Sequence, residues 1–120
     1  MLDNASHEFI RAVWKDTNQP IDSYKFAKKI GIIVKETILP DRVFAAVVHK
    51  TNRTPRIFIA ISDNENTKKF SCAVGIGFFF QNKILRKENY QCIYFRDDRG
   101  TLEEKIAYRF AIILLAKTPV

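Results

Sequence analysis

The chain has 120 residues, of which 47% are hydrophobic and 28% charged, a balance typical of one globular domain and not of a disordered chain. No apolar stretch approaches the roughly 20 residues that a membrane span needs, and the first residues lack the basic and apolar regions of a signal peptide. Two cysteines are too few for a disulfide scaffold. We therefore expect a single cytoplasmic domain over residues 1–120, with no membrane partner.

Two helices are predicted first. Apolar residues at helical spacing predict one helix over about residues 4–17 and another over about residues 22–30. Asp22 has the side chain of an N-cap for the second helix, and Gly31 is typical of the residue that ends one.

Three strands are predicted next. Short runs of β-branched and apolar residues cover 32–38, 43–49 and 57–61. The polar segment between the last two runs contains Asn, Thr and Pro, which are typical of a hairpin loop.

The second half of the chain predicts a central helix and a terminal helix. The helix that begins near Glu65 is apolar around most of its circumference, so we expect it in the core. Thr101 and Glu104 form a capping-box pattern at the start of a helix over residues 102–115. The apolar run 90–95 is a candidate for a further short strand, which we leave out of the expected sheet. The expected fold is an α+β domain, a three-stranded sheet packed on helices.

Residues that could perform catalysis are few. His7 and Glu8 begin a string like the zinc-binding HExxH motif, but Arg11 stands where the second histidine is required and cannot bind zinc. His49 follows a predicted strand and Cys72 lies on the central apolar helix, so both are better explained as structural residues. From the residues alone, catalysis has no support.

The net charge of +7 indicates an anionic or acidic partner. Basic residues are densest in two short segments, and both are first of all explained as solvated loops. The candidate partner-binding residues are Lys50, Arg53 and Arg56 in the first segment, and Lys83, Arg86 and Lys87 in the second.

Several strings, in order over about residues 20–116, resemble the ImmA/IrrE family of zinc metallopeptidases. They are Pro20–Asp22, Phe26–Ile32, Pro55–Ile59, Lys69–Ala73 and Glu104–Ala111, the last followed by Leu114 and Leu115. The resemblance implies a small zincin-like domain.

The chain departs from this family at the zinc motif. Where the family carries HELGH, this sequence reads VGIGF, so Val74 and Phe78 replace the metal-binding histidines and Gly75 replaces the catalytic glutamate. The glycine of the motif is kept as Gly77, and the family's third ligand corresponds to Glu104, which the capping box also explains. One carboxylate cannot hold zinc, so we expect no metal, no other cofactor and no peptidase activity.

The resemblance implies a regulator that binds a protein without cutting it. Active members of the family cleave helix-turn-helix repressors, so an inactive member is expected to act as an antirepressor or modulator of such a repressor in a phage or mobile element. The alternatives are a basic domain that binds nucleic acid directly, driven by its charge, and a residual metallopeptidase built on His49, Asp97, Glu103 or Glu104.

Overall fold

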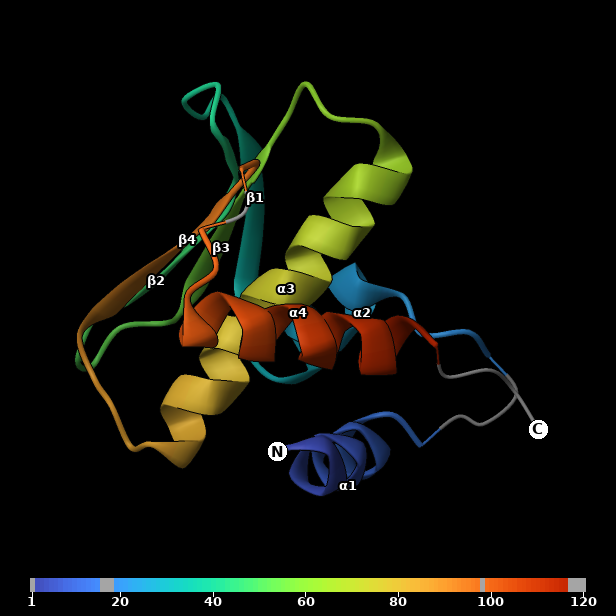
Figure 1. Ribbon diagram of the computed structural model, residues 1–120. Helices are drawn as coiled ribbons and strands as arrows, with labels where there is room; N and C mark the ends of the chain where they lie inside the picture. Colours follow the sequence, from blue (N-terminus) through green and yellow to red (C-terminus); the bar gives the residue numbers. More distant parts are fainter. Residues whose placement is uncertain (1, 16–18, 98, 117–120) are drawn as a thin grey trace.

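The computed structural model describes residues 2–15, 19–97 and 99–116 (Figure 1). Four helices and four strands follow one another in the order ααβββαβα. The helices are α1 (Asp3–Val13), α2 (Ser23–Lys29), α3 (Glu65–Ile84) and α4 (Leu102–Leu115). The strands are β1 (Ile33–Thr37), β2 (Val43–His49), β3 (Arg56–Ala60) and β4 (Tyr90–Phe95).

The strands form one mixed sheet in the order β1-β3-β2-β4. β1 runs parallel to β3, and β2 runs antiparallel to both of its neighbours. The expected three-stranded sheet is therefore wrong: β4 pairs with the free side of β2, with Tyr90 opposite His49 and Phe95 opposite Val43. Its backbone N–H and C=O groups need partners, and the unpaired edge of β2 supplies them.

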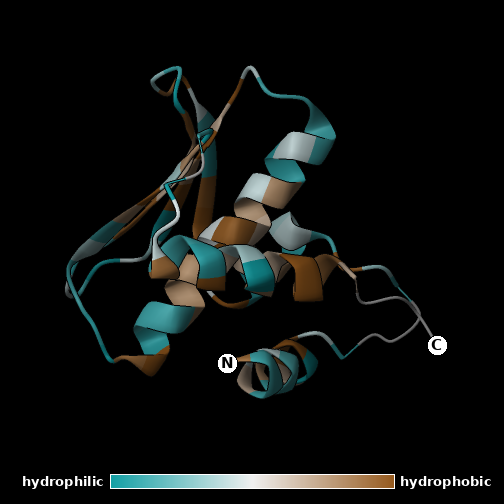
Figure 2. Cartoon of the chain, viewed as in Figure 1, coloured by the Kyte–Doolittle hydropathy of each residue, from teal (hydrophilic) through white to brown (hydrophobic). Residues whose placement is uncertain are grey.

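All four helices lie on one side of the sheet (Figure 1), so the expected α+β class is confirmed. α3 is the centre of the core, because every residue from 71 to 82 is buried. Figure 2 shows the middle of this helix in hydrophobic colours and its first turn in hydrophilic ones. The other helices pack around it.

Local interactions begin and end the second helix close to where the sequence predicts. The Asp22 carboxylate accepts the backbone N–H groups of Tyr24 and Lys25, at 2.9 and 3.3 Å. Gly31 has φ of +81°, a conformation that glycine adopts without strain. The first helix ends at Val13 and not at residue 17 as expected. Residues 16 and 17 of the expected range lie outside the described ones. None of the helices in the described part of the chain is both long enough and apolar enough to cross a membrane.

Candidate functional site

The candidate site is built around the point where α4 crosses α3. A Cβ atom added at Gly77 would lie 2.6 Å from the carbonyl oxygen of Ala107 and 2.8 Å from its Cα, so the two helix backbones touch there. Phe78 follows Gly77, and Glu104 stands one helical turn before Ala107. Both side chains consequently line one hollow of about 440 Å³. Phe78 and Glu104, the positions that the sequence resemblance aligns with two zinc ligands, thus face the same space.

The residues that the sequence resemblance aligns with the zinc motif do not fit a zinc ion. Val74 is wholly buried and Phe78 is 3% exposed, and neither side chain has an atom that can bind a metal. Gly75 packs against β3, where an added Cβ would lie 3.0 Å from the Cδ1 and Cγ2 atoms of Ile57. Among the described residues, no three His, Cys, Asp or Glu side chains are grouped as metal ligands would be.

Glu104 has a structural task in the first turn of α4. Its backbone N–H donates to the Thr101 hydroxyl at 3.1 Å, as the capping-box pattern predicts. Its carboxylate accepts the N–H of Arg99 at 3.3 Å, which ties down the turn before the helix. The carboxyl group is therefore buried and anchored.

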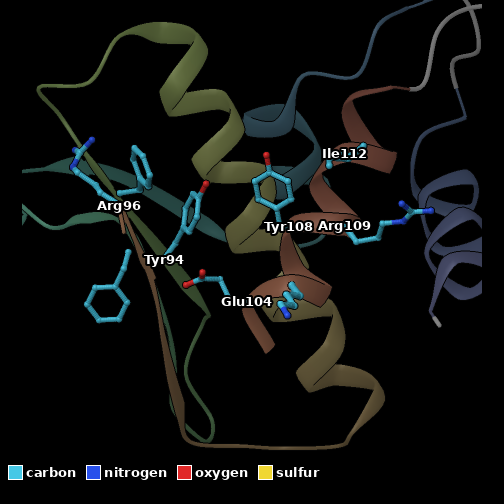
Figure 3. A pocket seen from close by; sticks show the side chains of 9 residues that line it. Tyr94, Arg96, Glu104, Tyr108, Arg109 and Ile112 are labelled. Atoms are coloured by element: carbon cyan, nitrogen blue, oxygen red, sulfur yellow. The ribbon is translucent and has the colours of Figure 1, made fainter. Parts of the chain in front are cut away.

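A wider groove lies between the end of β4 and the outer face of α4, and Figure 3 shows it from close by. We call it the β4–α4 groove; its volume is about 510 Å³. Its lining residues are Phe44, Tyr94, Phe95, Arg96, Glu104, Lys105, Tyr108, Arg109 and Ile112.

The sheet side of this groove is held rigidly. Arg96 donates two hydrogen bonds to the Asp63 carboxylate, at 2.8 and 2.9 Å, and its guanidinium lies 4.4 Å from the centre of the Phe44 ring. Phe44 in turn contacts Tyr94, with 4.8 Å between ring centres. Both hydrogen bonds come from Nη2, so Asp63 holds one end of the guanidinium, and the contact with Phe44 orients its plane. This wall is therefore organised before any partner arrives.

The helix side offers exposed contact area. Tyr108 is 45% exposed and packs edge-on against Phe70, and Ile112, one turn further along, is 43% exposed. Tyr94 faces these residues across the groove in Figure 3. Burial raises the pKa of Tyr94 to about 12, with smaller effects from Tyr108 and Glu104, so its hydroxyl stays protonated and can donate a hydrogen bond.

This groove was not among the sites predicted from the sequence, although the pattern of α4 carries part of its signal. Glu104, Tyr108 and Ile112 are spaced by four residues and therefore share one face of α4. The half that comes from Tyr94 and Arg96 could not be seen, because it depends on how β4 enters the sheet.

The other candidate catalytic residues do not line the β4–α4 groove. Glu103 lines the separate hollow that contains Phe78 and Glu104. Cys72 is fully buried, and burial raises the pKa of its thiol to about 12, which removes the thiolate a nucleophile needs. His49 packs against the rings of Tyr90 and Phe79. Asp97 pairs with Arg99 at 3.0 Å, while Asp98 lies outside the described residues.

The two basic segments, which are 26 residues apart in the sequence at their nearest, meet at one end of the sheet. The N–H of Thr51 donates to the Asn89 side chain at 2.7 Å and its hydroxyl to Glu88 at 3.3 Å, which joins the loop after β2 to the loop before β4. We call this surface the basic end. Its six exposed cations are Lys50, Arg53, Arg56, Lys83, Arg86 and Lys87.

No family model matches the sequence, and neither a curated protein nor a solved structure matches the chain. What the site can do therefore follows from its own side chains. The groove combines aromatic and aliphatic contact area with hydrogen-bond donors on Tyr94, Arg96 and Lys105. Such a lining suits the binding of a polypeptide segment.

Proposed function

We propose that the chain is an inactive, zincin-like relative of the ImmA/IrrE metallopeptidases that regulates a protein by holding it without cutting it. The observation that carries this proposal is the pairing of Phe78 with Glu104 in one hollow. Position 78 corresponds to a zinc-binding histidine of that family and Glu104 to its third ligand. Apolar side chains at positions 74 and 78 favour packing over metal binding.

The partner would enter the β4–α4 groove. β4 lies at one end of the sheet, so a partner segment could add a strand along its free side. An apolar side chain of that segment would pack between Tyr94, Tyr108 and Ile112. Arg96, held by Asp63, would receive a carboxylate or carbonyl oxygen.

A helix-turn-helix repressor is the partner that the sequence resemblance implies. A protein that occupies the repressor without cleaving it would act as an antirepressor or modulator. This role requires a stable complex with the intact repressor.

The test is affinity capture from the native host with three baits: the natural chain, Ile112→Glu and Leu102→Glu. Ile112→Glu places a charge in the groove, whereas Leu102→Glu is the matched control, because Leu102 is 60% exposed on the same helix and lies outside the groove. We expect a full-length repressor, identified by intact mass, with the natural chain and the control, and its loss with Ile112→Glu.

Three results would contradict the proposal. A clipped repressor in the eluate, or stoichiometric zinc in protein purified without chelator, would mean that the chain is a working peptidase. Equal capture by Ile112→Glu would mean that the partner binds elsewhere on the molecule.

A further inference from the structure

The basic end concentrates positive charge on two short segments. The segments 50–56 and 83–90 contain six basic residues and one acidic residue, Glu88. In the described part of the chain, none of the six forms an ion pair within 4.0 Å. Five basic residues elsewhere do form ion pairs: Lys68, Lys69, Arg96, Arg99 and Arg109.

The same two loops contain non-glycine residues in the left-handed backbone conformation. Asn52, Arg86 and Asn89 have φ of 62°, 55° and 56°, and they are the non-glycine residues with positive φ in the described part of the chain. Arg86 stands just after the end of α3, where the N–H of Lys87 bonds to the carbonyl of Asn82 at 3.0 Å. Glycine is the residue that favours this position, so an arginine is kept there at a cost in stability.

A cavity of about 290 Å³ opens beside the second basic segment, whereas Lys50, Arg53 and Arg56 line a separate hollow of about 630 Å³. Its floor is aromatic: His49 lies with its ring centre 5.6 Å from that of Tyr90 and 6.2 Å from that of Phe79. Lys83, Arg86 and Lys87 stand around it. The space suits one apolar side chain whose neighbours are negatively charged.

Exposed apolar residues lie among the cations. Ile84 and Leu85, at the end of α3, are 43% and 59% exposed. Figure 2 shows this turn in hydrophobic colour next to hydrophilic residues. A phosphate backbone would leave such side chains in water, whereas a protein segment can bury them.

We propose that the basic end binds an acidic segment of a partner protein, which places one apolar side chain in the cavity between His49, Phe79 and Tyr90. The carboxylates of the segment would pair with Lys83, Arg86 and Lys87, the cations that line this cavity. This surface lies at the start of β4 and the β4–α4 groove at its end, so the proposal stands independently of the groove.

The test uses three labelled probes and measures affinity by fluorescence anisotropy and contact residues by amide chemical shifts. The first probe is a capped glutamate-rich peptide with a central phenylalanine. The second has serine in place of that phenylalanine, and the third is a short DNA duplex. We expect the phenylalanine peptide to bind about tenfold more tightly than the serine peptide, since one buried aromatic side chain accounts for such a ratio. The shifted amides should lie in residues 49–53 and 83–90.

Arg86→Gly separates binding from folding. Glycine removes the backbone strain, so this variant should unfold at an equal or higher temperature and yet bind the phenylalanine peptide several-fold more weakly. Lys28→Ala, which removes an exposed cation on α2, is the matched control and should bind as the natural chain does. The groove variant Ile112→Glu should also bind this peptide normally, even if the groove proposal fails.

Three outcomes would overturn the inference. Equal affinity for the two peptides would mean that the cavity takes no side chain. Unchanged peptide affinity of Arg86→Gly would mean that the Arg86 side chain does not contact the bound peptide. Tighter, steeply salt-dependent binding of the duplex would identify the surface as a nucleic-acid site.

Discussion

Among single residues, one partly exposed network joins three elements. The Lys68 ammonium on α3 donates to a Glu36 oxygen on β1 at 2.8 Å, and the Tyr24 hydroxyl on α2 donates to the other at 3.0 Å. The hydrogen bonds from Lys68 and Tyr24 lower the pKa of Glu36. The hydrogen bond to Glu36 raises the pKa of Lys68. The charged forms of both residues therefore favour the folded state.

This network predicts a loss of stability in acid. Since the pKa of Glu36 is lower in the folded state, its contribution is present above the ordinary carboxyl pKa and disappears as the pH falls through the folded value. The contribution of Lys68 has the opposite sign and is lost only at alkaline pH. Glu36→Gln should thus reduce the urea midpoint near about pH 7, and the difference from the natural chain should shrink toward about pH 3.

The control for this measurement is Asp41→Asn, which changes an exposed carboxyl group in the loop between β1 and β2. It should follow the natural chain at every pH. Parallel curves for Glu36→Gln and the natural chain would show that the network contributes nothing to the pH dependence.

At the scale of elements, the α3–α4 crossing depends on a glycine that no other residue can replace. An added Cβ at Gly77 meets backbone atoms of Ala107, which cannot move without moving α4. At Gly75 it meets only the side chain of Ile57, which can adjust. The two glycines, two positions apart, therefore differ in what surrounds them.

We expect Gly77→Ala to destabilise the fold by about 3 kcal/mol or more, because the added methyl group overlaps backbone atoms that can move only if α4 moves. Gly75→Ala should stay within about 1 kcal/mol of the natural chain, since the helix propensity of alanine offsets the contact with Ile57. Adding Ile57→Val should make Gly75→Ala more favourable and leave Gly77→Ala unchanged, as measured by urea unfolding in a double-mutant cycle. An equal loss of unfolding free energy in Gly75→Ala and Gly77→Ala would contradict the close contact between α3 and α4.

At the scale of the whole molecule, α3 is the structural centre and α1 the outermost helix. α3 is buried continuously from residue 71 to residue 82, whereas α1 buries only Ser6 and Ile10. α1 is held by the packing of Phe9 on Phe80 and by the exposed ion pair of Asp3 with Arg109. Its contribution to stability should be correspondingly small.

Hydrogen exchange should reveal this order. Amides of α3 should exchange slowest, at rates set by global unfolding, and those of α1 should exchange faster through local opening. Exchange measured by mass spectrometry on peptides from the two helices tests it. Equal protection in both would mean that α1 and α3 unfold as one unit.

The sequence by itself determined the features that depend on neighbouring residues. Asp22 and Thr101 begin their helices through hydrogen bonds within three residues, and the predicted strand over 43–49 agrees with β2. The burial of α3 was also predictable, because its apolar residues surround the helix axis. In these cases the cause lies within one turn or one strand.

Only the tertiary structure decided which distant segments meet. β4 was not included in the expected sheet, since nothing in its six residues reveals that β2 has an edge without a partner. That pairing brings Tyr94 and Arg96 opposite α4, and it places Asn89 beside Thr51 so that the two basic segments join. Both proposed binding surfaces thus follow from the register of one strand, a long-range contact that no local pattern encodes.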